Sequence, residues 1–202
     1  MNLPLIYLAS QSPRRQQLLT QIGVSFELLL PVDAQAAEAL EAELPGETPA
    51  AYVKRVTLLK LQAAQHTMQQ TQRPSRAVLC ADTTVALGSQ ILGKPQDSAD
   101  AVRMLSALSG QTHDVYTAVA LQSGQRKWHC VQRSRVSFDK LDDADIAAYV
   151  ASGECMGKAG AYAIQGKAAV FIKRIVGSHS GIMGLPVYET HRMLKRLAKE
   201  QP

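Results

Sequence analysis

The chain has 202 residues and a formal net charge of +5; 46% of its residues are hydrophobic and 5% are aromatic. This length is enough for one substantial α/β domain, which we expect over 1–202 and which has at most two lobes. Lys and Arg are spread along the chain without a basic block, so a small anionic ligand accounts for the charge as well as a nucleic acid does. Three cysteines without CxxC spacing argue against a disulfide framework and against a cysteine zinc site.

The first apolar stretch, 5–8, is far shorter than a membrane span and has no basic region before it. We therefore expect neither a signal peptide nor a membrane anchor, and we expect a cytoplasmic protein. Because these residues are apolar and compatible with β-structure, they predict a buried strand.

A tight loop and a helix N-terminus are predicted directly after this first strand. Ser12 fits the helix cap and Pro13 fits the first helical position, where no N–H is missed. Unpaired backbone N–H groups and the positive end of the helix dipole then face the loop that contains Ser10. Arg14 and Arg15 follow at once, although cations disfavour this end of a helix unless an anion is bound there. A solvated surface pair is the alternative, but the pattern favours a phosphate-binding loop.

The hydrophobic pattern predicts further elements, and a core of Leu, Val, Ile and Ala suits helices packed on a central sheet. In chain order they are a strand over 25–30, an acidic segment over 34–46 that is either a short helix or a mobile flap, a helix over 48–69, a strand over 77–81 that kinks at Asp82 and continues as a hairpin to 92, a helix over 99–108, antiparallel strands over 112–122 and 127–138, a helix over 142–151, a Gly-rich irregular segment over 152–165, a strand over 169–176, a loop over 178–186 and a helix over 187–199.

Asp82 follows the buried apolar run 77–81 and is the leading candidate for a catalytic acid. An ionised carboxylate at the end of a buried strand costs desolvation energy unless a cation or a metal compensates. Ligands of open α/β sheets bind beyond the carboxyl ends of the strands, where Asp82, Ser10 and Lys94 meet if their strands are neighbours. Alternatively, Asp82 caps the turn that follows it, and Lys60 and Lys94 are solvated surface lysines.

Several familiar catalytic patterns do not occur in the sequence. The five histidines lack metal-binding spacing, and 177–181 fails the nucleophile-elbow pattern because its central residue is His179. Neither a P-loop nor a GxGxxG loop is present. Cations, carboxylates and hydroxyls without a covalent nucleophile favour metal-assisted hydrolysis of a phosphoanhydride, in which a carboxylate activates water.

Six short stretches, taken together and in order, resemble the Maf family of nucleotide pyrophosphatases, long labelled septum-formation inhibitors. They are ASQSPRR (9–15), ADT (81–83), GKP (93–95), LSGQTH (108–113), KAGAYAIQG (158–166) and GLP (184–186). The resemblance covers nearly the full length. It implies an elongated, two-lobed, inosine-triphosphatase-like α/β fold, with a mixed central sheet flanked by helices and an active-site cleft between the lobes.

The resemblance implies hydrolysis of dTTP and UTP, or of modified pyrimidine triphosphates, to the monophosphate and pyrophosphate with Mg²⁺ or Mn²⁺. Asp82 takes the family's proton-acceptor position and is expected to touch the metal. Arg14, Thr83 and Gln165 stand where the dTTP/UTP branch has its specificity residues. A homodimer, and roles in nucleotide-pool housecleaning and division arrest, are also implied. The residues expected to bind the triphosphate are Ser10, Ser12, Arg14, Arg15, Lys60 and Lys94.

Two positions depart from the family pattern. Gly157 stands where the branch usually has an acidic residue, and His179 stands where a tyrosine is common. Asp33 is a second candidate metal ligand, because the family often has an acid at this strand end; a turn aspartate is the alternative. The competing function is a non-catalytic nucleotide- or nucleic-acid-binding regulator of septum formation, which the basic composition leaves open.

Overall fold

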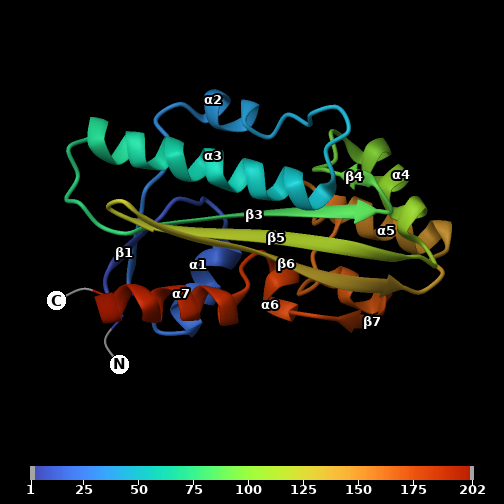
Figure 1. Ribbon diagram of the computed structural model, residues 1–202. Helices are drawn as coiled ribbons and strands as arrows, with labels where there is room; N and C mark the ends of the chain where they lie inside the picture. Colours follow the sequence, from blue (N-terminus) through green and yellow to red (C-terminus); the bar gives the residue numbers. More distant parts are fainter. Residues whose placement is uncertain (1–2, 201–202) are drawn as a thin grey trace. The chain divides into compact units, whose positions relative to one another are not determined.

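The computed structural model describes residues 3–200 and contains a mixed β-sheet flanked by α-helices (Figure 1). The strand order is β2-β1-β3-β5-β6-β7, with β4 paired to β3. The strands are β1 (Ile6–Leu8), β2 (Phe26–Leu28), β3 (Val78–Leu87), β4 (Gln90–Leu92), β5 (Thr112–Ser123), β6 (Arg126–Phe138) and β7 (Ile172–Val176). The helices are α1 (Pro13–Gln21), α2 (Ala34–Ala39), α3 (Pro49–Gln70), α4 (Ser98–Leu108), α5 (Asp143–Ala151), α6 (His179–Met183) and α7 (Val187–Glu200), and two 3₁₀ helices span Ala159–Ala161 and Lys167–Phe171.

The chain forms two compact units, and β3, β5 and β6 contribute residues to both. The first unit comprises the described residues of Met1–Asp82, Thr117–Val131 and Gly184–Pro202. The second comprises Thr83–Tyr116 and Gln132–Met183.

In the first unit, β1 is the centre of three parallel strands. Ile6 pairs with Phe26 of β2, and the last pair with β3 joins Leu8 to Leu79. Figure 1 shows α3 along one face of these strands and α1 with α7 along the other. Both faces are therefore covered, which explains why β1 is apolar throughout and fully buried.

Alternation along β3 sends every second side chain toward α3. Val78 and Cys80 pack there in one cluster with Leu61 and Met68 of α3. Asp82 is the next residue in this alternation, so it faces α3 beyond the last β1 pair. The sequence-derived periodicity of the long helix is confirmed, and Thr48 caps it by accepting the Ala51 N–H at 3.3 Å.

The second unit has its own apolar core. Helix α4 contributes Met104 and Leu105, and this core includes a group of aromatic rings. The rings of Phe138, Phe171 and Tyr149 meet edge to face.

The structure confirms the expected α/β class and most elements, but it corrects three local predictions. Strand β3 continues through Asp82 without a break, because the β-branched Thr83, Thr84 and Val85 favour extended backbone. Helix α6 lies inside the expected 178–186 loop, where Ser178 Oγ accepts the Gly181 N–H at 3.0 Å. The strand expected from 169 begins only at 172, since the preceding residues form a 3₁₀ helix.

Of the alternatives for the acidic segment 34–46, a short helix is present as α2. Within residues 3–200, no helix combines the length and apolar character needed to cross a bilayer.

Candidate active site

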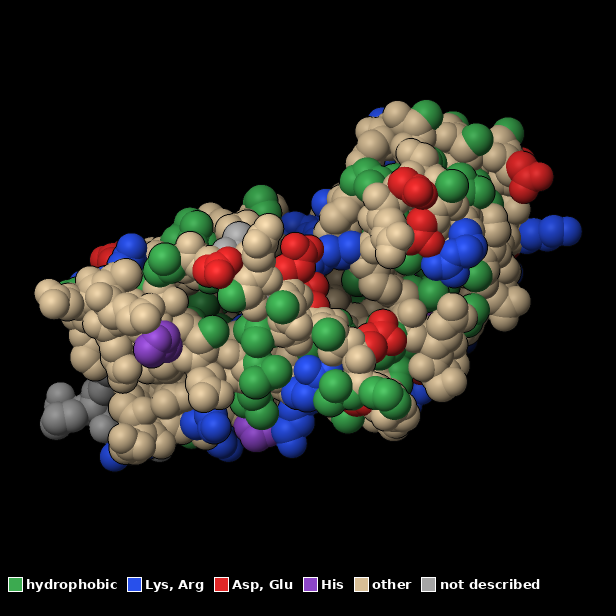
Figure 2. All heavy atoms as spheres, turned by 90° about the horizontal axis from the view of Figure 1, so that it is seen from above, with side chains coloured by type: hydrophobic (Ala, Val, Ile, Leu, Met, Phe, Trp, Pro, Cys, Tyr) green, Lys and Arg blue, Asp and Glu red, His purple; other side chains and the backbone are tan. Residues whose placement is uncertain are grey.

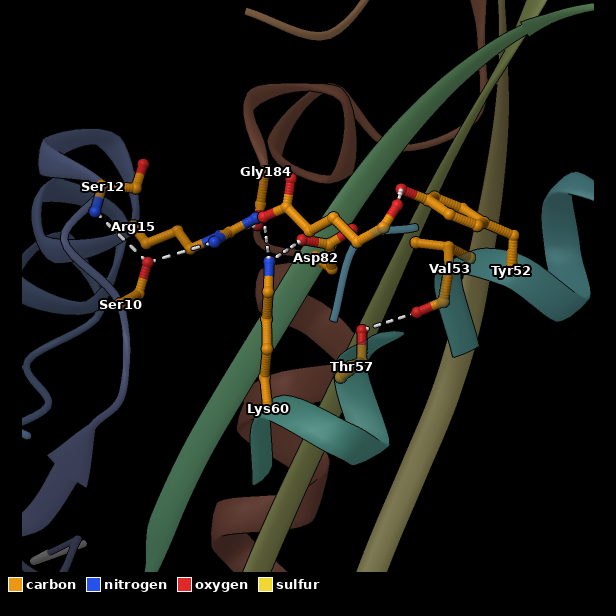
Figure 3. Close-up of polar contacts among 10 residues, drawn as sticks. Ser10, Ser12, Arg15, Tyr52, Val53, Thr57, Lys60, Asp82 and Gly184 are labelled. Carbon is orange, nitrogen blue, oxygen red and sulfur yellow. Dashed lines mark hydrogen bonds and ion pairs between the residues drawn. The ribbon is translucent and has the colours of Figure 1, made fainter. Parts of the chain in front are cut away.

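Asp82 lies in the middle of β3 and is only 8% exposed. Its Oδ1 accepts from Lys60 Nζ of α3 at 2.6 Å (Figure 3). Lys60 belongs to the turn of α3 that covers this face of the strand, and its side chain is 21% exposed. The desolvation cost of the Asp82 carboxylate is therefore offset by a partly buried cation.

Glu41 is a second carboxylate on the same lysine. Its Oε1 lies 2.7 Å from Lys60 Nζ, so the ammonium lies between two carboxylates. Burial alone lowers the pKa of Lys60, but the charges of Asp82 and Glu41 outweigh it, and the pKa is raised. Sequence reasoning missed Glu41, because nothing in the acidic segment distinguishes it from its neighbours Glu38 and Glu43.

Arg15 reaches the same site from α1. Its Nε donates to the Gly184 carbonyl at 2.8 Å, and its Nη1 donates to Ser10 Oγ at 3.0 Å (Figure 3). Burial lowers the pKa of the Arg15 guanidinium, and the Asp82 carboxylate acts in the opposite direction. Arginine stays charged under such shifts, so Arg15 and Lys60 give this site two fixed positive charges.

The expected capping role of Ser12 is wrong. Ser12 occupies the N-cap position of α1, but its side chain makes no capping hydrogen bond. Its backbone N–H instead donates to Ser10 Oγ at 3.2 Å. Ser10 therefore organises the loop, because one hydroxyl accepts from both the Ser12 backbone and the Arg15 guanidinium. Pro13 is at the first helical position, as expected.

The segment that carries Glu41 is tied to α3 at three points. Tyr52 Oη donates to the Glu41 carbonyl at 2.8 Å, and Arg55 Nη2 donates to the Ala42 carbonyl at 2.8 Å. Arg55 also forms a bidentate pair with Glu47, at 2.7 and 2.6 Å. Burial, followed by the charges of Asp82 and Glu41, raises the pKa of Tyr52. With the Lys60 contact, these bonds hold the Glu41 side chain at the site.

Cys80 is the buried thiol next to this site. Burial raises its pKa to about 12, although Lys60 and Arg15 act in the opposite direction. A thiol in this state is a poor nucleophile.

The other expected site residues lie in different places. Arg14 is half-buried in the first turn of α1, and Thr83 follows Asp82 on β3 and points to the opposite face. Lys94 and Gln165 belong to the second unit and are exposed, Lys94 between β4 and α4 and Gln165 between the two 3₁₀ helices.

Asp33 is the N-cap of α2. Its Oδ1 accepts the backbone N–H groups of Gln35 and Ala36 at 2.9 and 3.1 Å. This capping contact accounts for an exposed aspartate at this position, and its role as a metal ligand stays a prediction.

The carboxylates of this site fit a divalent cation. Mg²⁺ prefers oxygen ligands and is usually held by one or two carboxylates together with water and substrate phosphates. Asp82 and Glu41 offer such a pair, because both already contact one cationic nitrogen. The described residues hold no group of three or more His, Cys, Asp or Glu side chains arranged for a metal, so water and substrate would complete the ligand set.

Charged side chains are mixed on the face that carries α2 and α3. Figure 2 shows Lys and Arg scattered among acidic and hydrophobic side chains on this face. Basic side chains therefore do not gather into a single stripe on this face.

Comparison with known proteins identifies the family of this chain. The family model described as Maf-like protein matches residues 5–197. The chain is 58% identical over 190 residues to the dTTP/UTP pyrophosphatase of Albidiferax ferrireducens, covering 94% of this chain and 95% of that one. It is 56% identical over 190 residues to the dTTP/UTP pyrophosphatase of a Polaromonas species, covering 94% of each chain.

Among solved structures, the chain is similar to a nucleoside-triphosphatase / dITP/XTP pyrophosphatase from Mycobacterium abscessus, with a TM-score of 0.41 and 18% identity over 67% of this chain and 74% of that one. The family model and the close relatives each span nearly the whole chain, and the chain therefore belongs to the family of Maf-like proteins.

Proposed function

We propose that this protein hydrolyses dTTP and UTP between the α and β phosphates, releasing the nucleoside monophosphate and pyrophosphate. The names of close relatives of nearly equal length support the substrate and the reaction. The structural observation that carries the proposal is the convergence of Asp82 and Glu41 on Lys60, with Arg15 beside them.

In this proposal Asp82 is the general base. It is a carboxylate held in place by Lys60, and it accepts a proton from the attacking water. Arg15 and Lys60 bind the triphosphate and neutralise the charge that develops on it. Ser10, Ser12 and Arg14 complete the phosphate loop at the start of α1, and Lys94 adds a further cation. The structure supports Ser10 in this role most directly, because its hydroxyl orients Arg15.

Asp82 and Glu41 are the residues that would hold Mg²⁺ or Mn²⁺. When bound, the cation would neutralise phosphate charge and orient the phosphates. Lys60 already contacts the same two carboxylates in the protein alone, so positive charge beside them is favourable.

Arg14, Thr83 and Gln165 are proposed to select the pyrimidine base. The resemblance of the sequence to the Maf family implies that they stand at the specificity positions of the dTTP/UTP branch. Gly157 departs from that branch, but it has a φ of +69°, which glycine adopts without strain. The cytoplasmic location, the single 1–202 domain, the homodimer and the division-arrest role stay predictions.

The test is pyrophosphate release from a panel of common and modified nucleoside triphosphates with Mg²⁺ or Mn²⁺. We expect dTTP and UTP to be the best substrates. Asp82→Asn should reduce turnover by on the order of a hundredfold or more while nucleotide binding persists, because the geometry survives and the base does not.

Glu27→Gln is the matched control, since Glu27 forms an exposed ion pair with Arg76 in the same unit. If no triphosphate releases pyrophosphate, the enzyme proposal fails. A steeply salt-dependent, low-micromolar affinity for duplex DNA would then favour the regulator. If Asp82→Asn keeps wild-type turnover, the role of Asp82 is wrong.

A further inference from the structure

Gln165 stands at the corner of a tight turn in the second unit. The Gly166 N–H donates to the Ala163 carbonyl at 3.1 Å and closes a four-residue turn over 163–166. Ile164 is buried within the turn, whereas Gln165 is exposed. The position of the Gln165 side chain therefore depends on what holds this turn to the rest of the unit.

Glu154 holds the C-terminal end of the turn. Its Oε2 accepts the backbone N–H of Lys167 at 3.1 Å, and its Oε1 accepts from Tyr149 Oη at 3.0 Å. The carboxylate also lies directly against Gly166, where an added Cβ would overlap it. One side chain thus connects helix α5, through Tyr149, to the residues that immediately follow Gln165.

The N-terminal end of the turn is held as well. Ala161 is fully buried with a φ of +60°, a conformation that alanine keeps only where its surroundings enforce it. The next residue, Tyr162, is buried with its Oη 2.8 Å from His113 Nε2. Because the N-terminal end of the turn is fixed, the contacts of Glu154 at its C-terminal end determine the position of the turn over 163–166.

We propose that Glu154 is a positioning residue for substrate selection: its carboxylate fixes the turn over 163–166 and thereby the direction of the Gln165 side chain. The inference rests on the proposed function, in which Gln165 reads the pyrimidine base. Glu154 itself touches neither substrate nor metal in this assignment.

The measurement is a selectivity ratio, kcat/KM for UTP divided by kcat/KM for CTP. A loss of folded enzyme lowers both values equally and leaves the ratio unchanged, so the ratio separates positioning from a general structural role. Gln165→Ala should lower the ratio on the order of fivefold, the size of one lost hydrogen bond to the base. Glu154→Ala should lower it by a similar factor.

Three further variants sharpen the test. Glu154→Gln should keep a ratio near wild type, because its amide can still accept from Lys167 and donate to the Tyr149 hydroxyl. Gly166→Ala should behave like Glu154→Ala, since it displaces the carboxylate while leaving Glu154 in the chain. Asp100→Asn removes an exposed ion pair with Arg103 in the same unit and should leave the ratio unchanged.

A double-mutant cycle decides the mechanism. If Glu154 acts through Gln165, adding Glu154→Ala to Gln165→Ala should lower the ratio little further. Additive losses in the double mutant would overturn the inference but not the proposed function. The same holds if Gln165→Ala lowers the ratio while Glu154→Ala and Gly166→Ala both leave it unchanged. An unchanged ratio in Gln165→Ala would overturn the proposed base-reading role, and the inference with it.

Discussion

The stability of the second unit should depend on pH through the buried His113. This ring is 1% exposed and packs edge to face against Phe138 and Tyr162. Burial lowers the pKa of His113 to about 4, although the charge of the neighbouring Asp114 acts in the opposite direction. The native imidazole is therefore neutral above that pH, and its hydrogen bond with Tyr162 joins two neutral groups.

Unfolding exposes the imidazole and returns its pKa to 6.5. Between pH 6.5 and about 4 the unfolded chain binds one more proton than the native chain, so stability falls as pH falls through this window. Above pH 6.5 the imidazole is neutral in both states, so no stability is lost through His113. At ~1.4 kcal/mol per pH unit, the loss at the acidic end amounts to about 3 kcal/mol as an upper value.

The assay is urea unfolding at a series of pH values from about 4.5 to 7.5, a range set by the two His113 pKa values. Other groups titrate in this range, so the informative quantity is the difference in slope between wild type and His113→Gln. Glutamine does not titrate and can still hydrogen-bond to Tyr162, and a uniform loss of stability in the variant leaves the slope unaffected. As the pH is lowered, we expect the free energy of unfolding of the wild type to fall more steeply than that of His113→Gln, by up to ~1.4 kcal/mol per pH unit. Parallel curves would refute the reasoning.

Three further outcomes follow from the geometry. Gly160→Ala should destabilise the protein by about 2 to 4 kcal/mol in urea unfolding, because Gly160 has a φ of +68° and an added Cβ would lie 2.8 Å from Val85. Gly153 has a φ of +72° with open space around it, so Gly153→Ala should cost only about 1 kcal/mol. Equal losses of stability in the two variants would contradict this account. Arg55→Met should lower kcat/KM for pyrophosphate release by on the order of tenfold, because two contacts that hold the Glu41 segment are lost. An unchanged kcat/KM would show that the position of Glu41 does not depend on Arg55. Chelation by EDTA should abolish pyrophosphate release, and Glu41→Gln should raise the Mg²⁺ concentration for half-maximal activity by on the order of tenfold; an unchanged magnesium requirement would remove Glu41 from the metal site.

Much of the fold could be predicted from the sequence because its signals are local. The period of α3, with Thr48 and Pro49 at its start, and the apolar runs of β1 and β3 each depend on residues close together in the chain. The same reasoning selected Asp82 and Lys60, and the structure joins them at 2.6 Å. An ionised carboxylate in a buried strand is costly unless a cation or a metal compensates, whatever the remainder of the fold.

The tertiary structure alone decided which groups complete the site. Glu41 lies 19 residues before Lys60 in an acidic segment without distinguishing pattern, and only the bonds from Tyr52 and Arg55 bring it to the lysine. Ser10 likewise replaces Ser12 as the side chain that organises the loop, because its hydroxyl accepts from both the Ser12 N–H and the Arg15 guanidinium. Local propensity indicates most of the helices and strands, but the pairing of charges distant in sequence depends on how those elements pack.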